Sequence, residues 1–356
     1  MKRRAAGLAC MLLVAMHGAV AADDGQPQFS EWSAAVNFGP VVNSTADDAF
    51  PFISKDGRSL YFASNRPGGF GGFDIWVSQR RTVRDPWGPP QNVGPNINSS
   101  SNELTPALSP DGRRLYFGST GPGGFGAEDL YVSRRRNRRD DFGWRPSENL
   151  GSGVNTDASE GGPFHFEDDE TGTTTLYFNS DRLGGIGSFD IYASALQEGD
   201  EDEVFGPAVL VEELSTPLID RRPVIRRDGR ELLLESNRPG AIGGSLDLWV
   251  STRASTSDVW STPVNLGPVV NSAAVEARPA LSFRGTELYF NSNRPGGFGS
   301  QDLYISARTR LRNPVDDEEQ DDDVAATGWR GGGLATTSLV PSTGTTRSRE
   351  PSRRGP

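Results

Sequence analysis

Hydrophobic and polar positions alternate along most of this chain in short runs, and these runs predict β-strands. In residues 50–76 the runs are 50–54, 60–64 and 74–78, each rich in aromatic and β-branched residues. An Asp56-Gly57 turn, typical of a tight hairpin, separates the first two runs, and a glycine-rich loop at 68–72 separates the second from the third. No stretch shows a helical period of useful length, so the sequence predicts an all-β fold.

The same three-strand unit returns five times. An aspartate that precedes an aliphatic–aromatic pair sets the register of each copy, with spacings of 55, 61, 57 and 55 residues: Asp74, Asp129, Asp190, Asp247 and Asp302. The first four copies are followed by a further short run that begins with an aromatic residue: Trp87, Trp144, Phe205 and Trp260. One supersecondary unit repeated at a regular period predicts an array or a propeller.

The fifth copy has no such run after it, but the missing run stands near the N-terminus. Residues 32–44 match residues 260–272 almost residue for residue. We therefore expect the N-terminal strand to complete the last blade, which protects the sheet edges, whereas an open solenoid needs distinct capping repeats. The prediction is a monomeric five-bladed β-propeller of four-stranded antiparallel blades over residues 22–312.

The repeat also carries a family resemblance. The segment Pro106-Ala-Leu-Ser-Pro-Asp-Gly-Arg-Arg-Leu-Tyr-Phe117, followed by Gly-Gly-Phe-Gly and Asp129-Leu-Tyr131, resembles the WD40-like propeller repeat of the TolB type. The resemblance covers about residues 28–312. It implies a periplasmic propeller that serves as a docking scaffold for envelope proteins. TolB joins a six-bladed propeller to a separate N-terminal α/β domain, and neither the sixth blade nor that domain is expected in this chain.

The two ends of the chain differ from the repeat region. Lys2-Arg3-Arg4, an apolar stretch at 5–17 and Ala19-Val20-Ala21 predict a signal peptide over residues 1–21, too short for a membrane span of roughly 20 apolar residues. Cys10 lies within the apolar stretch, and lipidation at this residue stays an alternative. We expect a periplasmic or secreted protein, cleaved near Ala21. Residues 313–356, first acidic and then rich in Gly, Ser, Thr and Arg, predict a disordered tail.

Cleavage changes the composition. The mature chain would keep no Cys and no Met, one His (His165) and one Lys (Lys55), which excludes disulfides and thiolate metal sites. It would carry 33 basic and 47 acidic residues, a net charge of −14. Nucleic acid is not an expected partner of such an acidic chain, and we expect no transmembrane segment.

A carboxylate stands three residues before the first-strand proline of every repeat, and an arginine stands in the loop after the second strand of every repeat except the second, which has Gly121. The carboxylates are Asp48, Glu103, Glu160, Asp220 and Glu276, and the arginines are Arg66, Arg182, Arg238 and Arg294. We expect both sets to lie on one face, as a ring at the channel mouth. Three roles are open: ion pairs and backbone caps within the blade, a binding site for a ligand or for Ca²⁺, or the acid and base of a glycosidase.

The remaining candidates favour structural roles. Each register aspartate follows a glycine-rich turn, whose backbone N–H groups a carboxylate can accept. His165 has no second His or Cys with which to form a transition-metal site, so a structural histidine is expected. The tryptophans that begin the fourth strands favour packing between blades over a platform for sugars. No resident cofactor is expected.

Arginines gather in the turns that follow the first and third strands, at 80–81, 113–114, 134–139 and 226–230, whereas the third repeat is acidic at 198–203. Two interpretations of these arginines are possible: a face that is simply solvated, or a face that docks anionic partners.

The sequence is compatible with two functions. The leading prediction is an exported, non-catalytic propeller scaffold that binds a protein, peptide or glycan of the cell envelope through one face. The alternative is a carbohydrate-active enzyme, a glycoside hydrolase that uses the channel-mouth carboxylates. The leading prediction rests on the even recurrence of those carboxylates, since an enzyme is expected to break the blade symmetry where its chemistry lies.

Overall fold

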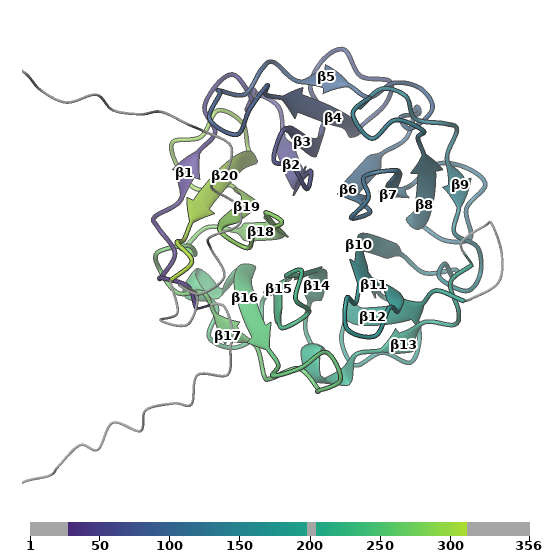
Figure 1. The fold of residues 1–356 in the computed structure, drawn as a ribbon, viewed down its shortest axis with the longest axis vertical. Coiled ribbons are helices and arrows are strands. Elements are labelled where there is room, and N and C mark those ends of the chain that lie inside the picture. Colours follow the sequence, from purple (N-terminus) through teal and green to yellow (C-terminus); the bar gives the residue numbers. More distant parts are fainter. Residues whose placement is uncertain (1–27, 198–203, 312–356) are drawn as a thin grey trace, which may run out of the picture. The chain divides into compact units, whose positions relative to one another are not determined.

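A computed structural model describes residues 28–197 and 204–311 of the chain. The predicted signal peptide, the acidic stretch of the third repeat and the predicted tail lie outside these residues. The described residues form five four-stranded antiparallel sheets arranged as a ring (Figure 1). Within them, no helix is long and apolar enough to cross a membrane. The predicted five-bladed β-propeller is confirmed.

Each blade consists of one inner strand, two middle strands and a two-residue outer strand. Blade one contains β2 (Asp48–Ile53), β3 (Ser59–Ser64), β4 (Asp74–Gln79) and β5 (Gln91–Asn92). Blade two contains β6 (Glu103–Leu108), β7 (Arg114–Ser119), β8 (Asp129–Arg134) and β9 (Glu148–Asn149). Blade three contains β10 (Glu160–Glu167), β11 (Thr174–Ser180), β12 (Asp190–Ala195) and β13 (Val209–Leu210).

The other two blades follow the same order, with two short 3₁₀ turns added. Blade four contains β14 (Asp220–Ile225), β15 (Glu231–Ser236), β16 (Asp247–Thr252) and β17 (Val264–Asn265). Blade five contains β18 (Glu276–Leu281), β19 (Glu287–Ser292) and β20 (Asp302–Ala307). The 3₁₀ turns are Glu212–Leu214 and Ile242–Gly244.

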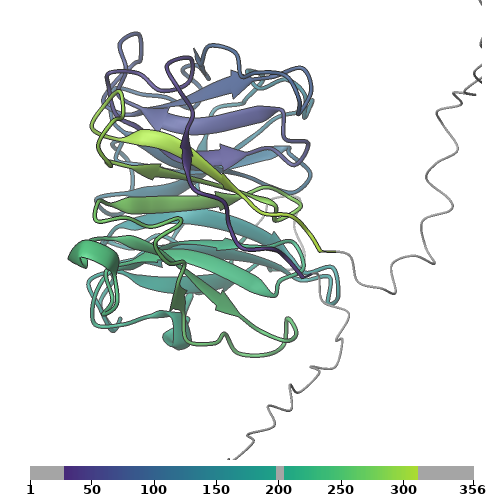
Figure 2. The same ribbon diagram turned by 90° about the vertical axis from the view of Figure 1, so that its left-hand side faces the viewer.

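The N-terminal segment closes the ring. Strand β1 (Val36–Asn37) pairs with β20, with Val36 opposite Ile305 and Asn37 opposite Tyr304. The backbone N–H of Ser33 donates to the carbonyl of Ala307 at 2.7 Å, which extends the pairing beyond β1. Figure 2 shows this N-terminal segment running along the yellow-green β20. The first and last parts of the propeller thus share one sheet, as the match between residues 32–44 and 260–272 predicted.

The hydrophobic core lies between neighbouring blades. One cluster joins Tyr61 and Ile75 of blade one to Leu115 and Phe117 of blade two, and all four side chains are buried. A second joins Tyr116 of blade two to blade three in the same way. Burial of these side chains removes apolar surface from water, so each blade depends on its neighbours for its core.

A stacked arginine and tryptophan recur in four of the blades. The guanidinium carbon lies 4.1–4.3 Å from the centre of the indole ring in the pairs Arg80–Trp87, Arg135–Trp144, Arg253–Trp260 and Arg308–Trp32. In each pair the arginine Nε also donates to the carbonyl of a hairpin glycine, at 2.6–2.8 Å. These tryptophans hold the outer strand against the hairpin turn, which is a packing role.

His165 lies in the interior, on β10. Its ring stacks on Tyr116 of blade two with 5.2 Å between ring centres, and the residue is 4 % exposed. Neither ring nitrogen has a hydrogen-bond partner among the described residues. Burial, followed by the charge of Arg114, lowers the pKa of His165 to about 4. The imidazole is therefore neutral at physiological pH, in agreement with the predicted structural role.

The low pKa of His165 predicts a loss of stability in mild acid. The unfolded chain binds a proton at about pH 6.5, whereas the folded chain resists it down to about pH 4, so the stabilising contribution is complete above pH 6.5 and disappears as the pH falls through this window. The loss amounts to roughly 3 kcal/mol. Urea unfolding at several pH values should show a smaller loss between pH 6.5 and 4 in His165→Phe than in the parent. Equal pH dependence of the two proteins would contradict this assignment.

Candidate functional site at the propeller axis

The five carboxylates of the predicted ring are fully buried at the beginning of the inner strands, 0–1 % exposed. In blade four, Asp220 accepts hydrogen bonds from the backbone N–H and the hydroxyl of Thr216, both at 2.6 Å, and from Nη2 of Arg238 at 2.5 Å. Three further ion pairs repeat this arrangement: Asp48–Arg66, Glu160–Arg182 and Glu276–Arg294. Each carboxylate thus joins its strand to the preceding turn and to the following loop.

Blade two lacks this arginine, and Glu103 keeps only the hydroxyl contacts that other blades also make to their ring carboxylate, for example from Ser272 and Ser292 to Glu276. Glu103 accepts from the hydroxyls of Ser99 at 2.7 Å and Ser119 at 3.0 Å. Burial raises the pKa of Glu103, although these hydrogen bonds oppose the shift. No group of three or more His, Cys, Asp or Glu in the described ranges is arranged to hold a metal ion. Ligand or Ca²⁺ binding by the ring stays a prediction, and the observed contacts account for these residues as packing within blades.

The register aspartates lie beside the glycine-rich turns. Oδ2 of Asp74 accepts the backbone N–H of Phe70 at 2.6 Å, and Asp302 accepts those of Phe298 at 2.7 Å and Gly299 at 3.0 Å. Corresponding contacts hold for Asp129, Asp190 and Asp247. These carboxylates satisfy backbone donors of the turn that no strand pairs.

The channel is lined by residues that differ from blade to blade. Every inner strand is irregular at the residue before its proline, where the backbone has a φ of 52–61°: Phe50, Thr105, Gly162, Arg222 and Arg278. Four of these five residues carry a side chain in a backbone region that favours glycine, and such strain gathers at functional positions. Together with the prolines they enclose a cavity of about 40 Å³, room for one or two water molecules.

Two carboxylates near these residues break the blade symmetry. Glu128 directly precedes a register aspartate, at a position that is Phe, Phe, Leu or Gln in the other blades. Glu235 precedes the last residue of β15, where the other middle strands have Ala, Gly or Asn. Neither residue belongs to the predicted ring. The signal in the sequence is this departure from the repeat, because each glutamate stands at a position where every other blade has an uncharged residue.

Three arginines surround this pair, and we name Glu128, Glu235, Arg221, Arg222 and Arg278 the axial cluster. Nε of Arg221 forms an ion pair with Oε1 of Glu235 at 2.9 Å. The backbone N–H of Arg278 donates to Oε2 of Glu235 at 2.7 Å. The guanidinium groups of Arg278 and Arg222 lie over the ring of Phe50, 3.8 and 5.1 Å from its centre.

Two glycines make room for Glu128. A Cβ atom at Gly118 would lie 2.1 Å from Oε1 of Glu128. A Cβ atom at Gly161 would lie 3.0 Å from the same oxygen and 2.7 Å from Nη1 of Arg222. The carboxylate of Glu128 therefore sits between the backbones of blades two and three, close to the Arg222 side chain, and any larger residue at position 118 would displace it.

The surroundings shift the pKa values of the two carboxylates in opposite directions. Burial raises the pKa of Glu128, and the charges of Arg222, Arg221 and Arg278 offset this only in part. Burial also acts on Glu235, but there the same arginine charges outweigh it and lower the pKa. Burial lowers the pKa of Arg278 to about 10. Of the two carboxyl groups, Glu128 is therefore the easier to protonate.

Several polar atoms of the cluster are buried and unpaired among the described residues. Within the described part of the chain, Oε1 of Glu128 and Nε and Nη1 of Arg222 have no hydrogen-bond partner. Glu235 is fully buried, whereas the Arg221 side chain is 21 % exposed and Glu128 is half-buried. Glu128 lies in the loop between β7 and β8, on the face of the propeller that carries this loop.

Several solved structures with the same fold are glycoside hydrolases. An α-L-arabinofuranosidase from Lactobacillus brevis aligns with a TM-score of 0.54 at 15 % identity, over 77 % of this chain and 93 % of that chain. A GH43_1 enzyme from Xanthomonas citri complexed with xylotriose aligns with a TM-score of 0.53 at 14 % identity, over 80 % and 91 % of the two chains. A GH62 hydrolase complexed with xylotriose gives 0.52 at 12 % identity, over 80 % and 100 %.

The sequence itself matches no described protein family and no curated protein at a significant level. The structural likeness, at these identities, establishes the five-bladed fold.

These comparisons correct two sequence-based predictions. The propellers that the chain resembles are of the GH43 and GH62 kind, so the resemblance to the WD40-like, TolB-type propeller is not supported beyond the fold. The leading functional prediction, a non-catalytic scaffold, is contradicted by the same neighbours, which favour the carbohydrate-active alternative. Its basis was the even recurrence of the ring carboxylates. That argument overlooked the two acids at which the symmetry is in fact broken.

Proposed function

We propose that this protein is a carbohydrate-active enzyme that hydrolyses a glycosidic bond at the axial cluster, with Glu128 as the general acid and Glu235 as the ionised partner. The observation that carries the proposal is the pair of carboxylates, unique to their blades, whose pKa values are shifted in opposite directions. Opposed shifts of this kind distinguish the acid from the base in known two-carboxylate sites. The neighbours of the same fold support it.

The chemistry follows from these two protonation states. Glycosidic bond cleavage needs a proton for the departing oxygen and a carboxylate that either activates water or attacks the sugar. Glu128, with its raised pKa and free Oε1, supplies the proton. Glu235 stays ionised beside Arg221, and the arginines around it hold its carboxylate in one orientation.

The neighbours suggest the substrate class. They include arabinofuranosidases and a xylan β-1,4-xylosidase, and two of them hold xylotriose. We therefore infer a pentose-containing polysaccharide, such as an arabinoxylan, as the substrate. The signal-peptide pattern of residues 1–21 supports action outside the cytoplasm, where such polymers are encountered.

The test is an assay of Glu128→Gln and Glu235→Gln on nitrophenyl pentosides and on arabinoxylan. Both changes preserve shape and remove the acid–base function, so kcat should fall by at least about a hundredfold. Glu128→Gln should lose less on nitrophenyl substrates, whose leaving group departs without a proton, than on the polymer. Glu235→Gln should be equally defective on both.

The matched control is Glu212→Gln, the same substitution at an exposed position away from the axis. It should retain full activity. A parent protein that hydrolyses none of these substrates would overturn the proposed reaction. Hydrolysis that survives both axial substitutions would instead place the reaction elsewhere.

A further inference from the structure

A wide basic depression lies at the end of the inner strands opposite the axial cluster. It has a volume of about 1,370 Å³ and is bounded by the first hairpin turn of every blade, for example at Lys55, Pro110, Asp169, Arg227 and Phe283. We call it the arginine bowl. Single-ligand pockets measure roughly 300–1,000 Å³, so the bowl exceeds what one small molecule fills and suits an extended ligand.

The bowl is basic although the protein is acidic. Its lining contains eleven Lys and Arg side chains and five Asp side chains, an excess of six positive charges, whereas the whole chain has a net charge of −11. A concave wall of one sign focuses its field and raises the local concentration of ligands of the opposite sign. The charge distribution therefore selects an anion.

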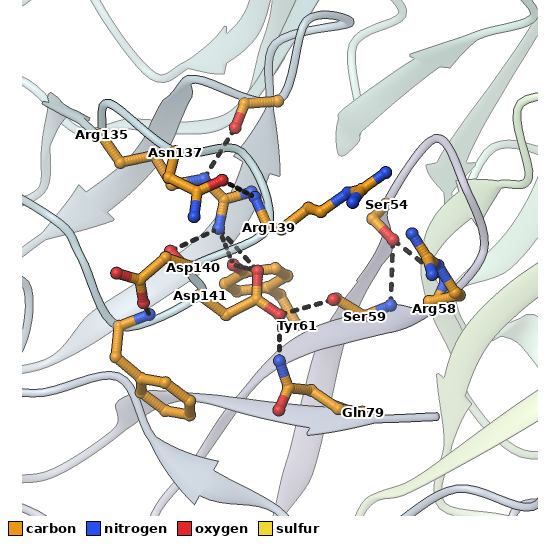
Figure 3. A network of polar contacts seen from close by, with 12 residues as sticks. Ser54, Arg58, Ser59, Tyr61, Gln79, Arg135, Asn137, Arg139, Asp140 and Asp141 are labelled. Carbon is orange, nitrogen blue, oxygen red and sulfur yellow. Dashed lines mark hydrogen bonds and ion pairs between the residues drawn. The ribbon is translucent and has the colours of Figure 1, made fainter. Parts of the chain in front are cut away.

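A buried network fixes part of this wall (Figure 3). Asp141, 3 % exposed, accepts hydrogen bonds at 2.5–2.6 Å from Ser59, Tyr61, Gln79 and Arg135, which joins blade two to blade one. The loop that carries Asp141 is thus anchored at its end.

Arg138 and Arg139 occupy the same loop, and both are exposed and line the bowl. In Figure 3, Arg139 extends toward the turn that contains Ser54 and Arg58 of blade one. An anchored loop presents its charges with little loss of freedom on binding.

A second group of cations meets on one aromatic ring. Nζ of Lys55 lies 4.3 Å, and the guanidinium carbon of Arg227 4.8 Å, from the centre of the Phe283 ring. These residues come from blades one, four and five. Arg227 has a carboxylate partner in Asp169 at 3.1 Å, but Lys55 has none within the described ranges. Two like charges held on one ring repel each other, and an anion between them would relieve the repulsion.

From these contacts we propose that the arginine bowl binds an acidic polysaccharide, a chain of sugars that carries carboxylates. Lys55, Arg138, Arg139, Arg284 and Arg310 have no ion pair among the described residues and supply the charge. Thr286 and the amide oxygen of Gln79 lie between them and offer a hydroxyl and a carbonyl oxygen to sugar hydroxyls. This mixture of cations and neutral hydrogen-bonding groups favours an acidic glycan over an acidic peptide, and the site is distinct from the proposed reaction centre.

The test measures binding of the full-length protein to polygalacturonate by calorimetry, with dextran as the neutral polymer and poly-L-glutamate as the acidic polypeptide. Polygalacturonate should bind, and its Kd should rise with salt because exposed charges are screened. Dextran should not bind. In Lys55→Glu/Arg284→Glu, polygalacturonate should bind about tenfold more weakly or worse.

The matched control is Arg84→Glu, a charge reversal at an exposed arginine outside the bowl. It should bind like the parent, and thermal melting should show that all variants fold. Absence of polygalacturonate binding, or equal loss in the control, would overturn the site. Equally tight binding of poly-L-glutamate would overturn the polysaccharide assignment. Hydrolysis of nitrophenyl pentosides should be unchanged in the bowl variants, so this test and that of the axial cluster fail independently.

Discussion

Deletion of residues 28–44 is expected to abolish cooperative melting of the propeller and to produce aggregation. The segment supplies the fourth strand of blade five, pairing Val36 and Asn37 with β20. It also places Trp32 on Arg308 and buries Val42 in the cluster between blades five and one. Without it, β20 exposes an unpaired edge, and such edges recruit other chains.

Differential scanning calorimetry and light scattering provide the measurement. The matched control removes residues 340–356, a deletion of the same length, and should melt like the parent. A 28–44 deletion that melts cooperatively at the parent temperature would show that closure contributes little, and that the remaining strands of blade five hold the ring together.

The fold was predictable because each repeat contains residues that determine its turns locally. The Asp-Gly hairpin, the glycine-rich loop and the register aspartate each specify a turn, and turns at a regular spacing specify blades. Closure was predictable for a separate reason. Residues 32–44 match residues 260–272, the fourth-strand segment of blade four. The fifth repeat lacks this segment, so the N-terminal copy has one place to pair, as the fourth strand of blade five.

The axial cluster was not predictable in the same way. Glu128 and Glu235 are 107 positions apart in the numbering and occupy different places in their blades, so only the ring brings them to the same arginines. The ring carboxylates, by contrast, were visible because they recur. Their recurrence reflects a need common to every blade, a partner for the first turn and the following loop.

The resemblance to the TolB-type repeat likewise rests on residues that recur in every blade. The residues that carry it, from the proline of the inner strand to the Asp-Leu-Tyr of the third strand, are those that build a blade. Unrelated functions share one fold, and the residues that distinguish them lie where the blades differ. In this chain those positions are the residues before the inner-strand prolines and the neighbours of Glu128 and Glu235.

The ion pairs inside the blades should matter greatly for stability, and blade four provides the sharpest case. Arg238 is 6 % exposed and its partner Asp220 is fully buried. Nη2 of Arg238 also donates to the carbonyl of Leu214 at 2.8 Å. Arg238→Met keeps the aliphatic stem and removes the charge, so the buried Asp220 keeps only the Thr216 contacts.

We expect Arg238→Met to lower the free energy of unfolding by about 3–5 kcal/mol, the usual effect of removing one partner of a buried pair. The double variant Asp220→Asn/Arg238→Met should recover part of this loss, because no uncompensated charge is left. Blade two supplies the control, since Glu103 already lacks an arginine and its pKa is raised by burial. Glu103→Gln should therefore cost far less than Arg238→Met in urea unfolding at pH 7. A similar cost for the two single variants would mean that the uncompensated charge of Asp220 is not what destabilises Arg238→Met, and that the pairs contribute through packing alone.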